Sequence, residues 1–343
     1  MLNRTCVIWL VALARPAFAA SITITSIGLP IGGDSTVVGI NAAGQAAGTT
    51  LDGTGLSAVG NVFFYSRGTT TNLGLLGGRA AAATGLNNFG HIVGNTDIPG
   101  TGTTSFLYSN GSAKYLPAGF NASAINDLGI IAGSMDFTGG YTAALDWAGK
   151  VFNLGTPGPT FNLSQATAIN DKGEVVGYAI DSANNNFTAA FFYANGVMAN
   201  IGSLDNLPYT TATAINREGV VVGYSAPGNF SGPGTKAFVY YKGKIFALPT
   251  PSNVLGSQAF GINNRDQIVG SYTPQGQTLS SAFIYSNGLF IDLNRLLPAG
   301  SPWELASAVG INDAGQIVGI GYLNGNHSQG ANQVFLMDIN GLK

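Results

Sequence analysis

The chain has 343 residues, of which 45% are hydrophobic, only 9% are charged and 50 are glycine. This composition excludes a disordered chain and predicts a large core stabilised by packing and backbone hydrogen bonds rather than by ion pairs. The formal net charge of −2, without a basic cluster, also excludes a polyanion-binding protein, so nucleic acid is not an expected partner.

The first 19 residues have the pattern of a cleavable secretory signal. A cation at Arg4 precedes a short apolar run, and the small-x-small site Ala17-Phe18-Ala19 follows it. The run is too short to span a bilayer, and no later segment is long enough, so no membrane span is expected. The one cysteine, Cys6, lies inside this signal, which excludes disulfides and thiol chemistry from the mature chain. We therefore expect residues 1–19 to direct export, and residues 20–343 to form one secreted, extracellular or periplasmic domain.

Seven copies of one motif follow along the chain. The motif reads Ala or Gly, Ile or Leu, Asn, two variable residues, Gly, three more residues and a second Gly. Its asparagines are Asn41, Asn87, Asn126, Asn170, Asn216, Asn263 and Asn312. An Asn that opens a type I turn hydrogen-bonds the backbone two residues on, and Gly at the fourth position accepts a positive φ, as does Asp266 in the sixth copy. Each copy therefore predicts a tight hairpin, and its second Gly indicates a β-bulge or a close backbone contact.

A second hairpin is predicted in each copy. Its first strand carries an alternating aromatic pair, and its turn contains Gly, most clearly in Asn110-Gly111, Asn195-Gly196 and Asn287-Gly288. The pairs are Phe63/Tyr65, Phe106/Tyr108, Phe191/Tyr193, Phe238/Tyr240 and Phe283/Tyr285, with weaker copies at Leu145/Trp147 and Phe335/Met337. Each unit thus comprises four short strands in roughly 46 residues, which is the size of a propeller blade.

These units predict an all-β fold, a seven-bladed β-propeller with four short antiparallel strands per blade. The last unit ends after three strands, and residues 22–28 form a strand that no unit precedes. We therefore expect the N-terminal strand to complete the last blade and to close the ring. The alternatives fit less well: an outer-membrane barrel needs longer strands, a β-solenoid has more uniform rungs, and a sandwich would not produce seven similar units.

The alternation of Gly-Ile-Asn-x-x-Gly-x-Ile-Val-Gly with Ala-Phe-x-Tyr-x-Asn-Gly resembles the bacterial extracellular repeat family named for its His-Ala-Phe signature. The resemblance covers residues 21–341. The eponymous His is absent, and its places are taken by Ala189, Lys236, Ser281 and Gln333. The resemblance implies an exported bacterial protein and implies no particular activity.

Motifs of known catalytic chemistry are absent from the sequence. His91 and His327 stand in separate units and cannot build a His-rich metal site, and no nucleophile-and-base motif is present. Asp127, Asp171 and Asp313 lie within the Asn-Asp turns, where turn geometry accounts for them.

The candidate site lies on what we call the loop face, the side of the ring that carries the long connections after strands two and four. Function concentrates on such loops over a rigid scaffold. Four acids there follow the second motif Gly by three or four residues, and aromatic residues accompany them. The acids are Asp52, Asp97, Asp136 and Asp181, and the aromatic residues are Tyr141, Phe187, Tyr209, Phe230 and Trp303. Aromatic rings and carboxylates together suit a glycan, and the carboxylates also suit Ca²⁺, which prefers oxygen ligands.

We therefore expect a monomeric, non-catalytic binding module for an extracellular polysaccharide or protein, with no resident cofactor. Two alternatives stay open. The first is a glycoside hydrolase or lyase that uses two loop-face carboxylates as acid and base. The second is a structural component of an extracellular matrix.

Overall fold

The structure is a computed structural model that describes residues 22–29, 33–53, 59–137, 139–228, 232–328 and 330–339. The predicted signal, residues 1–19, and Phe230 lie outside these ranges. In the part of the chain that the structure describes, no helix has the length and apolarity needed to span a bilayer.

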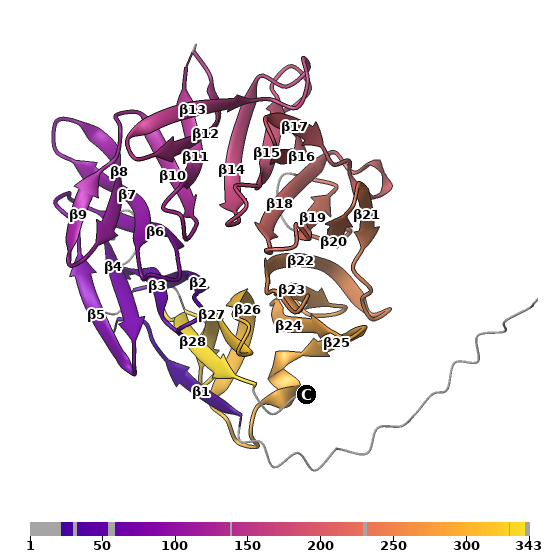
Figure 1. Ribbon diagram of the computed structural model, residues 1–343. Helices are drawn as coiled ribbons and strands as arrows, with labels where there is room; N and C mark the ends of the chain where they lie inside the picture. Colours follow the sequence, from indigo (N-terminus) through magenta and orange to yellow (C-terminus); the bar gives the residue numbers. More distant parts are fainter. Residues whose placement is uncertain are drawn as a thin grey trace, which may run out of the picture.

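Seven four-stranded antiparallel blades stand in a ring around a central axis (Figure 1). In blades 1 to 6 the first strand lies next to the axis and the fourth strand lies outermost. Blades 4 and 5 are joined into one continuous sheet by a parallel pairing between Thr188 and Tyr209. The predicted seven-bladed propeller is therefore confirmed.

The strands of each blade are short. Blades 1 and 2 comprise β2 (Ser35–Ile40), β3 (Ala46–Asp52), β4 (Val59–Ser66), β5 (Thr69–Gly74), β6 (Ala81–Leu86), β7 (Ile92–Ile98), β8 (Gly102–Ser109) and β9 (Ser112–Tyr115). Blades 3 and 4 comprise β10 (Phe120–Ile125), β11 (Ile131–Asp136), β12 (Tyr141–Trp147), β13 (Lys150–Gly155), β14 (Leu163–Ile169), β15 (Val175–Asp181), β16 (Phe187–Ala194) and β17 (Val197–Asn200). Blades 5 and 6 comprise β18 (Tyr209–Ile215), β19 (Val221–Ala226), β20 (Lys236–Tyr241), β21 (Lys244–Ala247), β22 (Val254–Ile262), β23 (Ile268–Pro274), β24 (Ser281–Ser286) and β25 (Leu289–Asp292). Two short 3₁₀ helices, η2 (Leu204–Asn206) and η3 (Leu293–Leu296), lie in connections between blades.

Blade 7 combines the two ends of the chain. Its inner three strands are β26 (Trp303–Ile311), β27 (Gln316–Leu323) and β28 (Gln333–Asp338), and its outermost strand is β1 (Thr23–Ser26). β1 runs antiparallel to β28, with Thr23 opposite Asp338 and Ser26 opposite Phe335. The N-terminal strand thus closes the ring as predicted, and the ring cannot open without breaking this pairing.

The repeated Asn-x-x-Gly segments form the predicted turns. In blade 4 the Gly173 amide donates to the Asn170 carbonyl at 3.0 Å, and the Lys172 amide donates to Asn170 Oδ1 at 3.1 Å. The fourth residue has φ +76° at Gly173 and +58° at Asp266, which explains why Asp replaces Gly in the sixth copy. Because each of these turns follows an inner strand, all seven lie on one side of the ring, which we call the turn face.

The second motif Gly marks a close backbone contact, and the bulge lies in the strand opposite. A Cβ on Gly177 would stand 2.0 Å from the Gln165 carbonyl oxygen. Opposite it, the register of β14 shifts between Ala166 and Ala168, and every inner strand has such an irregularity at the equivalent place. The bulge and the missing Cβ together let the first two strands of each blade approach one another near the axis.

The core between the blades is built on six fully buried phenylalanine rings. They are Phe63, Phe106, Phe191, Phe238, Phe283 and Phe335. Blade 3 differs from the prediction. The residue opposite Gly133 is Ala144, so the second member of the pair is Asp146. The predicted pair Leu145/Trp147 is one residue out of register, and this part of the prediction was wrong. The Ala148-Gly149 turn, with φ +55° and +88°, fixes this register. Phe120 of the inner strand is buried in the same cluster as Ala144 and fills the space.

Candidate functional site

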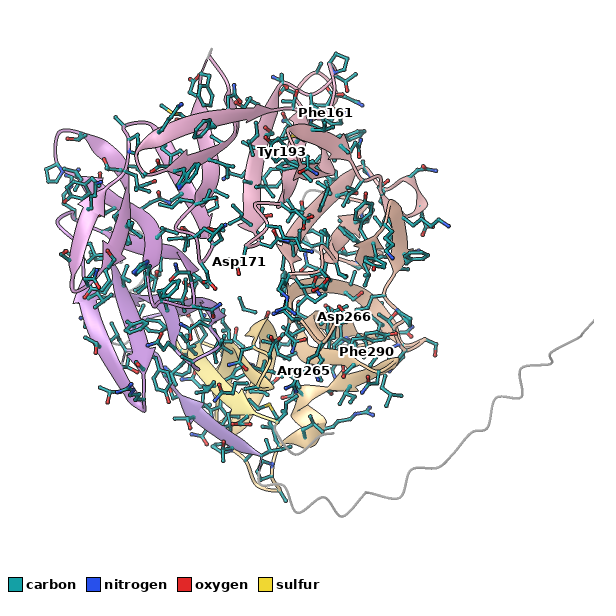
Figure 2. All side chains as sticks on the ribbon, viewed as in Figure 1. Phe161, Asp171, Tyr193, Arg265, Asp266 and Phe290 are labelled. Atoms are coloured by element: carbon teal, nitrogen blue, oxygen red, sulfur yellow. The ribbon has the colours of Figure 1, made fainter. Side chains whose placement is uncertain are left out.

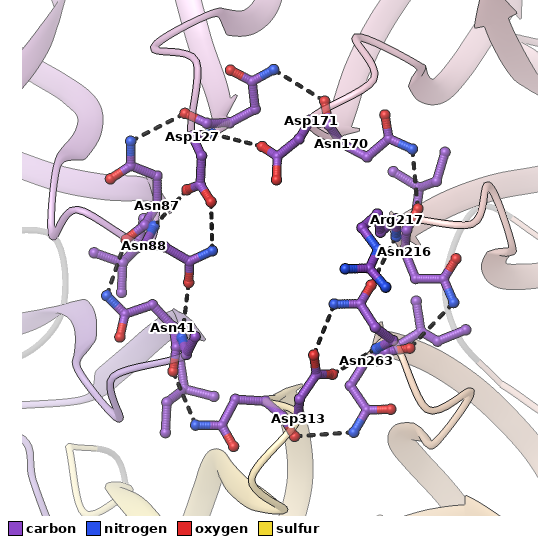
Figure 3. Close-up of a pocket in the computed structure, with 18 of the residues that line it drawn as sticks. Asn41, Asn87, Asn88, Asp127, Asn170, Asp171, Asn216, Arg217, Asn263 and Asp313 are labelled. Atoms are coloured by element: carbon purple, nitrogen blue, oxygen red, sulfur yellow. Dashed lines mark hydrogen bonds between the residues drawn. The ribbon is translucent and has the colours of Figure 1, made fainter.

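Seven asparagines form a closed hydrogen-bonded circle on the turn face (Figure 3). Each motif Asn donates its side-chain Nδ2 to the backbone carbonyl of the motif Asn in the next blade. The seven bonds are 2.9 to 3.2 Å long, and the last runs from Asn312 to Asn41 across the closure of the ring. All seven residues are buried. Each side chain therefore shapes its own turn through Oδ1 and ties that turn to the next blade through Nδ2.

The residues that follow the asparagines form a second, incomplete circle. In five places the backbone amide of one residue donates to a side-chain oxygen of its counterpart in the next blade, at 2.8 to 2.9 Å. The members are Ala42, Asn88, Asp127, Asp171, Arg217, Asn264 and Asp313. The circle is interrupted after Asp171 and after Asp313, because Arg217 and Ala42 carry no side-chain acceptor.

These two circles line a cavity of about 460 Å³ at the axis of the ring. Its wall also includes the aliphatic residue that precedes each Asn, such as Ile40 and Ile125. Its lining includes the carboxylates of Asp127, Asp171 and Asp313 and one guanidinium, that of Arg217. Within the lining described, the charged side chains sum to −2, so the cavity attracts a cationic group.

The three carboxylates are not equally engaged. Asp127 accepts from the Asn88 amide and from Asn88 Nδ2 at 2.8 and 2.7 Å, and Asp313 is held in the same way by Asn264. Asp171 accepts the Asp127 amide on Oδ1 at 2.8 Å, and among the described residues no hydrogen bond reaches its Oδ2. Asp171 lies at the central opening (Figure 2), so its carboxylate is the one most available to a ligand.

The third residue of each turn also stands on the turn face, and it is apolar in some blades and charged in others. Each follows directly a residue that lines the cavity, and the seven are Ala43, Phe89, Leu128, Lys172, Glu218, Arg265 and Ala314. In the neighbouring blades 2 and 3 these residues are Phe89 and Leu128, and they are 69% and 64% exposed. Blades 4 to 6 present the charged members instead. The turn face therefore offers an apolar arc and a charged arc around an acidic cavity.

The sequence-based interpretation of the turn acids was wrong. The carboxylates of Asp127, Asp171 and Asp313 bond the preceding blade or face the cavity, and none of them caps its own turn through a hydrogen bond recorded in the described residues. The position of these residues in the repeat was the signal that could have revealed the site. A ring closes only if all seven turns meet at its axis, so polar residues repeated after the Asn had to gather there.

The predicted loop-face acids lie at or next to the ends of the second strands, at the end of each strand away from the turn. Three of them are engaged locally. Asp97 forms an ion pair with Arg79 at 3.1 Å, and Asp136 Oδ1 accepts the amides of Gly139 and Gly140. Asp181 Oδ1 accepts the Ala183 amide at 3.2 Å. Asp52 is exposed at the end of β3. The four acids belong to four different blades, and within the described residues no group of three potential metal ligands is found.

The predicted loop-face aromatic residues also differ in what they contact. Tyr141 is 48% exposed at the start of β12, directly opposite Asp136. Tyr209 packs edge-on against Phe187 at 5.4 Å between ring centroids. Trp303 is half-buried and lies 6.2 Å from the core ring of Phe335. A ligand-binding role for the predicted loop-face residues stays a prediction.

The fold defines the class of the chain as a β-propeller, and solved structures agree. It is similar to the β-propeller domain of the Trilobed protease from Pyrococcus furiosus, with a TM-score of 0.57 and 11% identity over 89% of this chain and 96% of that one. It is also similar to YCF48 bound to D1 peptide, with a TM-score of 0.54 and 12% identity over 93% and 94% of the two chains. A puromycin-hydrolyzing peptidase from Mycobacterium tuberculosis matches at TM-score 0.53 and 10% identity, over 89% of this chain and 53% of that one.

Residues 195–342 match the family model "Protein of unknown function (DUF3466)". A comparison with curated proteins gave no match. At 10 to 12% identity, the solved structures support the propeller fold and say nothing of activity.

Proposed function

We propose that this chain is an exported, non-catalytic β-propeller that binds a segment of another extracellular protein on its turn face. The observation that carries the proposal is an acidic cavity at the axis, with two exposed apolar side chains, Phe89 and Leu128, on the same face and each next in sequence to a residue that lines the cavity. The segment it suits has a Lys or Arg side chain for the cavity and an apolar residue beside it.

The negative charge of the cavity favours a basic side chain in the bound segment. Asp127 and Asp313 already have both oxygens bonded by asparagines, whereas Asp171 has an oxygen to offer. A charge-assisted hydrogen bond to a guanidinium or ammonium is stronger than a neutral one. A basic side chain that enters the cavity would therefore bond Asp171 and offset the charge of −2.

The exposed apolar side chains of Phe89 and Leu128 favour an apolar residue in the bound segment. Phe89 and Leu128 stand at the tips of adjacent turns, whose backbones are tied by the bond from Asn87 to Asn126. Large apolar side chains held this rigidly and exposed at 69% and 64% cost free energy in water, and they are typical anchors of a protein interface. Because the scaffold is already ordered, little entropy would be lost when a partner covers them.

Two further observations support the proposal. YCF48, which shares the fold, is described as bound to a peptide, so a propeller of this type can accept one. The signal pattern of residues 1–19 and the resemblance to the His-Ala-Phe repeat family both favour export, which would bring extracellular proteins within reach.

An array of short peptides that differ in Arg, Lys and apolar content tests the proposal directly. We expect hits that require one basic and one apolar residue. Asp171→Asn should weaken them about tenfold, since a lost charged hydrogen bond is worth about 1.5 kcal/mol. Phe89→Ala combined with Leu128→Ala should weaken them at least as much. The matched control, Asp97→Ala combined with Asp136→Ala on the loop face, should leave binding unchanged, and loss of binding in this control would overturn the proposal.

A second candidate function, glycan binding, is favoured by a cavity of about 400 Å³ between blades 5 and 6 on the loop face. Its polar lining consists of uncharged hydroxyl and amide side chains: Thr235, Ser257, Gln258, Ser271, Tyr272, Thr273, Gln277, Thr278 and Ser280. Such groups suit the hydroxyls of a neutral sugar. A glycan array with and without Ca²⁺ distinguishes the candidates, because a hit lost in Gln258→Ala and kept in Asp171→Asn would place the ligand here.

A further inference from the structure

Blade 3 departs from the repeat at a buried position. Five blades place a half-buried tyrosine two residues after the core ring position and the seventh places Met337, but blade 3 places Asp146 there. The tyrosines pack against the cores between blades. In blade 3 the smaller Asp146 leaves unfilled the space that a tyrosine occupies in those five blades. A cavity of about 260 Å³ lies at this place, between blades 2 and 3.

Asp146 is largely buried, and its carboxylate has one oxygen bonded within the chain and one oxygen that reaches solvent through the cavity. The residue is only 3% exposed, and its Oδ1 accepts the Gly149 amide at 2.8 Å. Among the described residues no hydrogen bond reaches Oδ2, and no cation lies within ion-pair distance of the carboxylate. Burial raises the pKa of Asp146, while the Gly149 amide and the charge of Lys114 oppose this rise. An ammonium ion in the cavity would bond this accessible oxygen and offset the cost of placing the charge among apolar groups.

The rest of the lining is largely apolar. Leu107, Leu116, Pro117 and Ile131 form the walls around Asp146. The volume is just below the range of cavities that hold drug-sized ligands, so it suits a molecule of only a few heavy atoms. A carboxylate at one side of a small apolar cavity has the polarity of a site for an amine on a hydrocarbon chain.

We propose that this cavity binds a primary ammonium ion carried on a short apolar body, with Asp146 accepting the ammonium hydrogen bonds. Oδ2 takes the N–H donors, and the aliphatic walls cover the hydrocarbon. The site shares no lining residue with the central cavity, and the proposal does not depend on the function proposed for the turn face.

Lys114 is the competitor within the chain. It lines the same cavity, and its own ammonium could swing toward Asp146 in place of a ligand. The variant Lys114→Ala separates these two cases, because it removes the internal cation and leaves the carboxylate.

Titration of the purified chain with n-butylammonium, followed by ¹H–¹⁵N NMR, tests the proposal. The Gly149 amide, which donates to Asp146, should shift in a saturable manner, and n-butanol, which has the same shape without the charge, should have no such effect. Asp146→Asn keeps an acceptor for Gly149 and should weaken binding at least tenfold. Asp146→Tyr restores the residue of the other blades and should abolish binding by filling the cavity.

The control variant Asp171→Asn alters the central cavity and should leave the Gly149 response intact. The proposal is overturned if Gly149 shows no saturable shift, if n-butanol matches n-butylammonium, or if Asp146→Asn binds as well as the wild type. If Lys114→Ala bound n-butylammonium and the wild type did not, the proposal would also be overturned. The Lys114 ammonium would then be the group that pairs with Asp146.

Discussion

Asn126→Ala removes one link of the hydrogen-bonded circle, and the structure gives the size of the expected loss. Asn126 is buried, and its Oδ1 accepts the amides of Leu128 and Ile130 at 3.1 and 2.9 Å. Its Nδ2 donates to the Asn170 carbonyl of blade 4 at 3.0 Å. Each bond contributes about 1 kcal/mol, so the loss of three predicts a decrease of about 3 kcal/mol in the free energy of unfolding. In the described residues only Asn87 and Asn126, of the seven, have an Nδ2 that no second side chain bonds, so the effect of Asn126→Ala is simple to interpret.

Urea unfolding followed by circular dichroism measures this decrease. Leu128→Ala in the same turn is the matched control, because Leu128 is 64% exposed and its truncation should change stability by less than about 0.5 kcal/mol. If Asn126→Ala cost less than about 1 kcal/mol, or no more than the control, the circle would not contribute to holding the blades together and the reasoning would be refuted.

Three further predictions concern packing and pH. Gly177→Ala should destabilise the fold by about 3 kcal/mol or more in urea unfolding, because its Cβ would meet the Gln165 carbonyl oxygen at 2.0 Å, whereas Gly158→Ala, with open space around it, should be neutral. Phe191→Ala should cost about 3–5 kcal/mol by the same assay, because the ring is fully buried, and a loss below 1 kcal/mol would contradict the assigned core. Asp146→Asn should stabilise the chain at pH 7. Burial raises the pKa of Asp146 above its ordinary 3.8, so folding favours the protonated carboxyl. As the pH rises through the folded pKa, the carboxyl ionises and this contribution to stability is lost. The gain should vanish near pH 3, and a gain that does not depend on pH would contradict this account.

The repeat made the architecture predictable because local and global requirements coincide in it. Asn170 and Gly173 specify a turn by their backbone geometry alone, and the buried Phe191 marks the middle of a blade. Seven such units together with an unmatched first strand left few folds open. Blade 3 was misread because Leu145 and Trp147 look like a weak aromatic pair, and only the strand register, set by the next turn, shows that the pair is Ala144 and Asp146.

The candidate site was less predictable because it exists only after the ring closes. Asp127, Asp171 and Asp313 are far apart in the sequence, and each has a sufficient local reason to stand in a turn. That their side chains bond the neighbouring blade depends on the distance between adjacent turns, which no single repeat encodes. The exposed Phe89 and Leu128 were missed for the same reason, since neighbouring tips become a surface only when blades 2 and 3 stand side by side.

The central claim is that the turn face binds the partner. Amide hydrogen exchange of the chain, with and without a peptide selected from the array, tests it most directly because it reports on both faces at once. The account predicts slower exchange at Phe89, Leu128 and Lys172 in the bound state, with no change near Asp97 and Tyr209. Protection confined to the ends of the second strands on the loop face would contradict it.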